Sequence, residues 1–77
     1  MSLLGLLAPL FPDLDRSLTS ADSRDTIESW DSFKHAEIVI VLEEEYGVRL
    51  STADIVKMTS ISSMTEVLRG HGVGIEP

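Results

Sequence analysis

The segment from Ser32 to Tyr46 constrains the fold of this chain more than any other stretch. Apolar residues recur in it at helical spacing, a capping residue precedes it, and Gly47 is a suitable left-handed C-cap. At about 1.5 Å per residue such a helix is about 22 Å long. A chain of 77 residues has only a marginal core. We therefore expect this helix to form the axis of the domain.

The N-terminal part is expected to contain a short helix followed by a long loop. Ser2 can cap the helix, and Pro9 must either kink it or lie near its end. Little regular structure is indicated from there to Asp31, so this loop is longer than most connections in compact domains. Such a loop is stable if its own side chains fill the core. Four side chains are candidates for this: Leu14, Leu18, Ile27 and Trp30.

Two further helices are predicted after the central one. Ser51 or Thr52 can cap a very short third helix over residues 53–58. The stretch over residues 59–63 offers several caps for a last helix, and Ser63 with Glu66 matches the capping-box pattern.

Together these signals predict an all-α fold, a small four-helix bundle with a long first loop and a short third helix. We expect a single domain over residues 1–77, with its core at 2–70 and a frayed tail at 71–77. No segment alternates with a period of two over a strand length. Because the chain has no cysteine, ordinary side-chain packing must stabilise it without disulfides or a thiolate metal site.

The charge balance restricts the class of partner. Six Lys and Arg against thirteen Asp and Glu give a formal net charge of -7. Nucleic-acid binding needs clustered cations and is excluded, whereas proteins with basic surface patches are favoured as partners. No run is long enough to span a membrane, and residues 1–11 lack the basic region and cleavage motif of a signal peptide. We expect a cytoplasmic protein and a monomer.

The central helix has two different faces. At 100° per residue the core face contains His35, Ile38, Val39, Leu42 and Tyr46. The opposite side carries a mixed set, which we call the docking stripe: Phe33, Ala36, Glu37, Ile40 and Glu44. A solvated face would not place Phe33 and Ile40 among carboxylates, and a buried face would not include Glu37 and Glu44. The stripe favours a transient docking surface. The alternative is that the first loop covers Phe33 and Ile40.

Ser32 begins the central helix directly after Asp31. Taken alone, a serine at such a position is usually an N-cap. Asp31 can perform the capping instead, which would free the Ser32 hydroxyl to face solvent on the first turn. A phosphodiester on that hydroxyl would lie at the positive end of the helix dipole. The position therefore permits a phosphate-linked modification without selecting it.

The triplet Asp31-Ser32-Phe33 resembles the Asp-Ser-Leu motif of the acyl carrier proteins. The match continues at the spacing typical of that family through Glu37, Glu43-Glu44-Glu45, Tyr46-Gly47-Val48, Asp54-Ile55-Val56 and the segment 59–68. It covers essentially residues 18–68. Phe33 replaces the usual leucine. Trp30 stands where many members have Gly or Leu, as in free-standing carriers from specialised pathways.

This resemblance implies an acyl-carrier type of bundle and the function of a carrier. In that family a phosphopantetheinyl transferase transfers a 4'-phosphopantetheine arm from coenzyme A to the motif serine, here Ser32. The arm holds acyl groups as thioesters and presents them to acyl-loading and acyl-processing enzymes of fatty acid or polyketide-type pathways. Asp31 would cap the helix and help the transferase to recognise the site. Met58 and Ile61 would line the arm or the acyl chain beside the short helix.

Other classes of function remain open beside the carrier. A non-carrier acidic interaction module with an unmodified Ser32 would share the same fold-scale features. An enzyme is disfavoured, because no convergent catalytic residues stand out. His35 and His71 have no ligand partners at metal spacing, so no metal site is indicated. The direction of His35 is toward the core, which favours a packed side chain over a general base.

Overall fold

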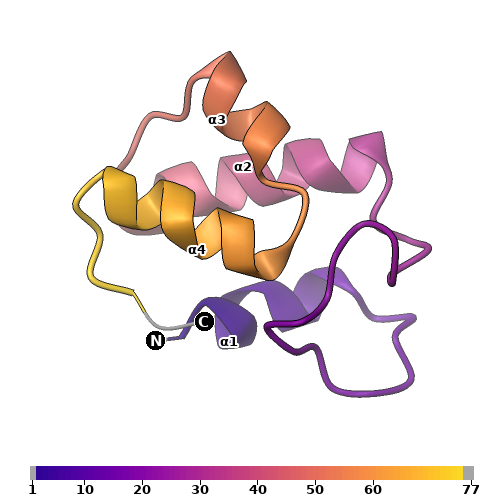
Figure 1. Ribbon diagram of the computed structural model, residues 1–77. Coiled ribbons are helices and arrows are strands. Elements are labelled where there is room, and N and C mark those ends of the chain that lie inside the picture. The colour runs from indigo at the N-terminus through magenta and orange to yellow at the C-terminus, as the bar shows by residue number, and fades with distance from the viewer. Residues whose placement is uncertain (1, 76–77) are drawn as a thin grey trace.

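The computed structural model describes residues 2–75, and these fold mostly into helix (Figure 1). The four α-helices are α1 at Leu3–Leu7, α2 at Ser32–Tyr46, α3 at Thr52–Lys57 and α4 at Ile61–Gly70. Within the described residues no strand forms. An isolated antiparallel bridge joins Ser23 to Ser60. The predicted all-α class, the long first loop and the short third helix are confirmed.

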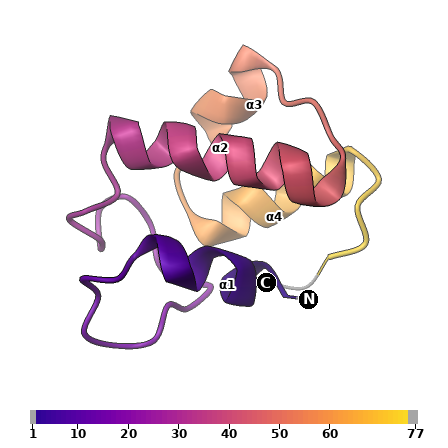
Figure 2. The same cartoon turned by 180° about the vertical axis from the view of Figure 1, so that it is seen from behind.

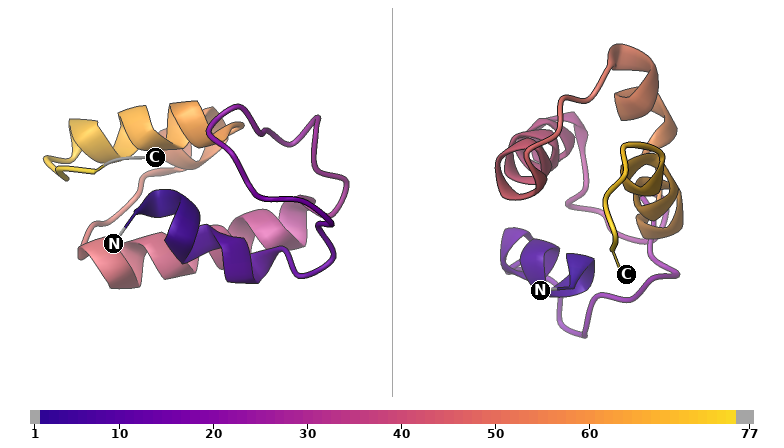
Figure 3. Two further views of the ribbon diagram at one scale, coloured as in Figure 1. Left: turned by 90° about the horizontal axis from the view of Figure 1, so that it is seen from below. Right: turned by 90° about the vertical axis from the view of Figure 1, so that its left-hand side faces the viewer.

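The helices are arranged around α2. In Figures 1 and 2, α2 and α4 run in the same direction across the molecule, and α1 runs in the opposite direction. The right-hand view of Figure 3 looks along these three helices and shows α3 above α2 and α4. The long first loop gathers at the end of the molecule where α2 begins. Over residues 2–75, no helix is both long and apolar enough to cross a membrane.

Local capping explains where most helices begin and end. The Ser2 hydroxyl accepts from the Gly5 amide at 3.0 Å, and α1 ends before Pro9, which lies in a 3-10 turn over Ala8–Leu10. Gly47 ends α2 with a φ of 63°, a left-handed conformation that glycine adopts without steric cost. These three expectations from the sequence are confirmed.

The last two helices both begin with capping boxes. Ser51 and Asp54 form the box of α3, as the choice between Ser51 and Thr52 allowed. The N-cap of α4 is Ser60, which lies within the stretch 59–63 that offered several caps, and Ser63 is its N3 partner, so the predicted Ser63–Glu66 box is wrong. The Ser60 hydroxyl accepts from the Ser63 amide, and the Ser63 hydroxyl accepts from the Ser60 amide, both at 3.0 Å. A serine at N3 thus performs the role usually given to Glu or Gln.

The first loop supplies part of the core that the helices enclose. Leu18, Ile27 and Trp30 are buried, and Leu14 is partly buried against them. The prediction that loop side chains fill the core is confirmed. A short domain with a five-residue first helix needs this contribution, since burial of apolar surface is its main source of stability.

A buried carboxylate organises the loop from within. Asp22 is 3% exposed and forms a two-bond ion pair with Arg16, at 2.7 and 2.9 Å. It also accepts from the Thr19 amide and the Thr26 hydroxyl, both at 2.9 Å. The hydrogen bonds from Arg16, together with those of the two threonines, hold the pKa of Asp22 well below its usual range. Because the charge is paired and hydrogen-bonded, the fold tolerates it at this depth.

Backbone hydrogen bonds attach this loop to the start of α4. The Arg24 amide donates to the Thr59 carbonyl, and the Ile61 amide donates to the Asp22 carbonyl, both at 3.0 Å. These bonds flank the Ser23–Ser60 bridge. They place Ser60 in the extended conformation that an N-cap requires.

The segment after α4 is packed, which corrects the expectation of a frayed tail from residue 71. Ile75 is 7% exposed and belongs to the core. The Val73 amide donates to the Leu68 carbonyl at 3.1 Å, and Gly72, with a φ of 84°, turns the chain back. Burial of the apolar residues of this segment removes them from water and so adds to the stability of a fold with a small core. Residues 76 and 77 lie outside the described residues.

Candidate functional site

Ser32 occupies the first position of α2, and its neighbour takes over the capping. Asp31 has an extended backbone, and its Oδ1 accepts from the Lys34 amide at 2.9 Å. The His35 amide donates to the Asp31 carbonyl at 2.9 Å and begins the helical ladder. Ser32 is exposed. The expected division of roles between Asp31 and Ser32 is therefore present in the structure, with the hydroxyl open to solvent at a helix N-terminus.

The first loop does not cover the docking stripe. Phe33 is 82% exposed and Ile40 is 57% exposed. Ala36 and Glu44 are exposed as well, and Glu37 is half-buried. The alternative in which the loop shields the apolar members of the stripe is therefore wrong. Large apolar side chains that remain exposed among carboxylates are typical of interaction surfaces.

Lys34 modifies the charge of the stripe close to Ser32. Its amine donates to Glu37 at 2.9 Å and lies 5.8 Å from the centre of the Phe11 ring. Its side chain is only 21% exposed. The cation thus lies back toward the first loop and offsets the charge of Glu37. Glu44, two turns further along, remains exposed.

A shallow pocket of about 340 Å³ adjoins the far end of the stripe. It is lined by Ile40, Glu43, Glu44, Val48 and Arg49. Glu43 also closes the turn after α2, because its Oε2 accepts from the Leu50 amide at 2.8 Å. The carboxylate of Glu43 therefore has a structural role that the acidic run in the sequence did not indicate.

Val56 is an exposed apolar residue that sequence reasoning missed. It is 70% exposed on α3, a helix that buries none of its own side chains completely. The His35 ring contacts the carbonyl of the adjacent Ile55 at 2.9 Å, so this part of α3 lies against the first turns of α2. Six residues are too few for hydrophobic periodicity to assign a face, which explains why the pattern did not reveal Val56.

Met58 and Ile61 lie in the core, each with 0% exposure. They present no surface to an arm that lies on the outside of the molecule. Contact with them requires that an acyl chain enter the interior between the helices.

His35 is buried between the first loop and α3. The Trp30 indole Nε1 donates to His35 Nδ1 at 3.0 Å, and the Phe11 ring packs against Trp30 with ring centres 5.9 Å apart. His35 is 7% exposed. The prediction that this histidine is packed in the core is confirmed.

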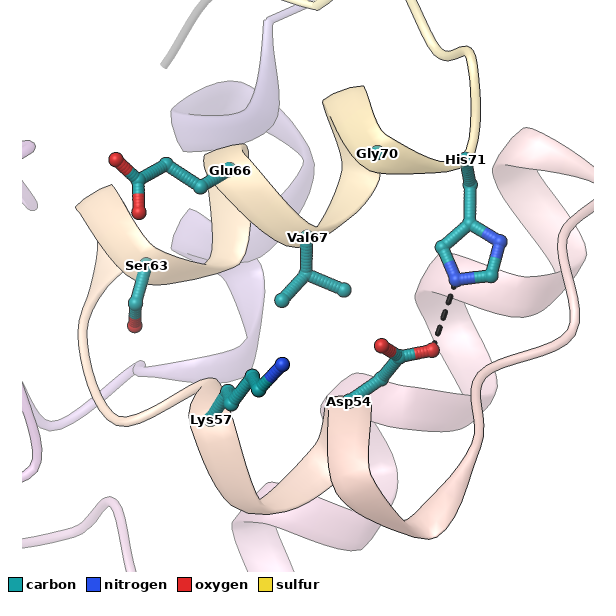
Figure 4. Close-up of a pocket in the computed structure, with 7 residues that line it drawn as sticks. All are labelled: Asp54, Lys57, Ser63, Glu66, Val67, Gly70 and His71. Carbon is teal, nitrogen blue, oxygen red and sulfur yellow. Dashed lines mark hydrogen bonds and ion pairs between the residues drawn. The ribbon is translucent and has the colours of Figure 1, made fainter.

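A second pocket, of about 510 Å³, lies between α3 and α4 (Figure 4). His71 Nε2 donates to Asp54 Oδ2 at 2.8 Å, which lowers the pKa of Asp54 to about 2. The side chains of Lys57 and Val67 point into the space between the helices, whereas Glu66 points away. The sequence did not predict this pocket, because its walls come from segments that are separate in the chain.

Among residues 2–75, no three His, Cys, Asp or Glu side chains are grouped so that they could hold a metal ion. Comparisons with known protein families, with curated proteins and with solved structures found no match for this chain.

Proposed function

We propose that this chain is a carrier domain of the acyl-carrier type, with a 4'-phosphopantetheine arm attached to Ser32. It would carry acyl intermediates as thioesters in a specialised fatty acid or polyketide-type pathway. The observation that carries the proposal is the division of roles at the start of α2. The Asp31 side chain accepts the hydrogen bond of the Lys34 amide, and the Ser32 hydroxyl stays exposed beside it.

The residues around Ser32 fit a phosphodiester. The hydroxyl lies on the first turn of a helix of 15 residues, where backbone amides and the helix dipole favour negative charge. The Asp31 carboxylate is hydrogen-bonded to the Lys34 amide, so part of its charge is already satisfied. No buried side chain has to move to expose the nucleophile.

The attachment step uses Ser32 as the nucleophile in the active site of a phosphopantetheinyl transferase. A bond forms between Ser32 Oγ and the phosphorus that bears the pantetheine, and the pyrophosphate bond of coenzyme A breaks. The nucleotide leaves, and the hydroxyl proton passes to the transferase or to solvent. Once attached, the arm supplies a terminal thiol for the thioester. The domain itself performs no chemistry and holds the arm at the start of α2.

The docking stripe supports the proposal that partner enzymes bind to α2. Phe33 and Ile40 supply exposed apolar anchors, and Glu44 supplies negative charge for partners with basic patches. Such a surface suits the transferase and the enzymes that load and process the acyl group. A carrier must leave each partner quickly, and a small mixed surface gives weak contacts. We place these exchanges in the cytoplasm, with the domain as a monomer.

One observation also favours the second candidate, an interaction module with an unmodified Ser32. The exposed Phe33 and Ile40 can bind a partner without any arm. The two functions differ in what happens when Ser32 becomes alanine. A module keeps its partner, whereas a carrier loses its function.

The test is loading of the purified chain with coenzyme A by a broad-specificity transferase. Ser32→Ala must lose the modification. Ser62→Ala is the matched control, because Ser62 is also an exposed serine on the first turn of a helix, α4. Loading of Ser32→Ala, or its loss in Ser62→Ala, would contradict the assignment.

A further inference from the structure

Both histidines of the chain contact the short helix α3. His35 Nε2 lies 2.9 Å from the Ile55 carbonyl oxygen, and His71 Nε2 donates to Asp54. Helix α3 has no fully buried side chain of its own. These two polar contacts join α3 to the first turns of α2 and to the residue that ends α4.

The hydrogen bonds of His35 define its tautomer. The indole nitrogen of Trp30 can only donate, so His35 Nδ1 must be the unprotonated acceptor of that 3.0 Å bond. The ring proton then lies on Nε2, which donates to the Ile55 carbonyl. The neutral ring thus joins Trp30, two residues before Ser32, to the backbone of α3.

A second proton on this ring is incompatible with the contact to Trp30. Protonated histidine carries a donor on both nitrogens, so Nδ1–H would face the indole N–H. The buried indole would lose its acceptor, and buried donors without partners are strongly disfavoured. The bond to the Ile55 carbonyl can persist, because Nε2 remains a donor. Trp30 is therefore the group that must move away.

We propose that Trp30, His35 and Ile55 form a proton-operated latch. With a neutral His35 the latch holds Trp30, and with it the start of α2 at Ser32, against α3. Protonation of His35 releases Trp30 and loosens the segment that leads into Ser32. The latch is a property of the fold and holds whether or not Ser32 carries an arm.

The charged groups around the ring are already engaged elsewhere. On α2, Asp31 accepts from a backbone amide and Lys34 pairs with Glu37. On α3, Asp54 is held by His71 and by the Ser51 amide. On the loop side the ring stacks on the uncharged ring of Trp30, which in turn packs against Phe11. Both hydrogen-bond partners of the His35 ring, the Trp30 indole and the Ile55 carbonyl, are uncharged groups.

The experiment is a pH titration of the unmodified protein from about pH 8 to about pH 5. The signals of Trp30, the single tryptophan of the chain, are recorded at each pH. The readouts are its indole N–H resonance and its fluorescence emission. His35→Gln is the key variant, because a glutamine amide can accept from Trp30 and donate to Ile55 but does not titrate. His71→Gln is the matched control that removes the other histidine.

The wild type and His71→Gln are expected to show the same transition. In both, the chemical shift of the Trp30 indole N–H changes and the fluorescence emission of Trp30 shifts to the red. His35→Gln is expected to show neither between the same pH limits. A transition that persists in His35→Gln, or one that disappears in His71→Gln, overturns the latch. The nitrogen-15 spectrum of the wild-type ring gives a check that needs no variant. A proton on Nδ1 at about pH 8 would also overturn the proposal.

Discussion

Asp31 Oδ1 accepts the backbone N–H of Lys34 across 2.9 Å, which places the cap of α2 one residue before Ser32. The carboxylate of Asp31 therefore performs the structural task that a serine at a helix start usually performs. The Ser32 hydroxyl is left exposed on the first turn. This relationship leads to the first prediction.

Replacing Asp31 by alanine is expected to lower the free energy of unfolding by about 1 kcal/mol, since an N-cap is lost. Asp31→Asn keeps an accepting side-chain oxygen and is expected to cost much less. Chemical denaturation of the two variants and the wild type gives the comparison. Equal losses in both variants would show that the charge of Asp31, and not its cap, stabilises α2.

Most helix ends could be predicted because caps are local. Ser2, Asp31, Gly47 and Ser51 each act within three or four residues, and the sequence contains all that is needed to recognise them. The position of Phe33 opposite the core face also followed from its angle on a long helix, whereas its exposure is known from the structure. Such features depend only on residues that are close together in the chain, so they can be recognised in a single sequence.

The start of α4 could not be predicted in the same way. Both Ser60 and Ser63 can cap a helix, but only the pair 63/66 has the glutamate that the capping-box pattern expects, so the local sequence favours the wrong box. The choice comes from the first loop, where the Asp22 carbonyl accepts from the Ile61 amide. Likewise, the burial of Ile75 and the ion pair of Asp22 depend on contacts between distant segments. Periodicity and propensity contain no information on such contacts.

The ion pair of Asp22 leads to the second prediction. Asp22→Asn removes the charge that faces Arg16 and is expected to lower the free energy of unfolding by about 2–3 kcal/mol, since a buried network is broken. Asp25→Asn, on an exposed part of the same loop, is the matched control and is expected to stay within about 0.5 kcal/mol. Urea denaturation measures both. A similar effect of the two substitutions would mean that Asp22 does not organise the loop.

The third prediction concerns how the stability of the fold changes as the pH falls. The pKa of Asp54 falls from 3.8 to about 2 on folding, chiefly through the hydrogen bond from His71. A carboxyl whose pKa is lowered in the folded state stabilises the protein above its unfolded pKa and loses this effect as the pH falls through its folded pKa. The wild type is therefore expected to be more stable than Asp54→Asn near neutral pH. The difference should shrink as the pH falls from about 4 toward about 2.

Denaturation curves of the wild type and Asp54→Asn at a series of pH values provide this comparison. The pH at which the two stabilities converge is the quantity of interest. A difference that stays constant down to acid unfolding, or one that grows there, would speak against the Asp54–His71 contact.

The fourth prediction tests the docking stripe. Because Phe33 is 82% exposed, Phe33→Ala is expected to change the free energy of unfolding by no more than about 0.5 kcal/mol. Loss of an apolar anchor is expected to lower kcat/KM for transferase loading about fivefold or more, which corresponds to about 1 kcal/mol. Phe33→Leu, which restores an apolar side chain, should recover most of this rate. Unchanged kinetics in Phe33→Ala would remove Phe33 from the docking surface.

The central claim is that Ser32 Oγ is the attachment point of the arm. The most direct test is the intact mass of the folded chain after incubation with coenzyme A and a broad-specificity phosphopantetheinyl transferase, with Ser32→Ala treated in parallel. We expect a gain of one phosphopantetheine in the wild type and none in Ser32→Ala. No gain in the folded wild type with several transferases would contradict it, and would favour an interaction module in which Ser32 is an ordinary first-turn residue.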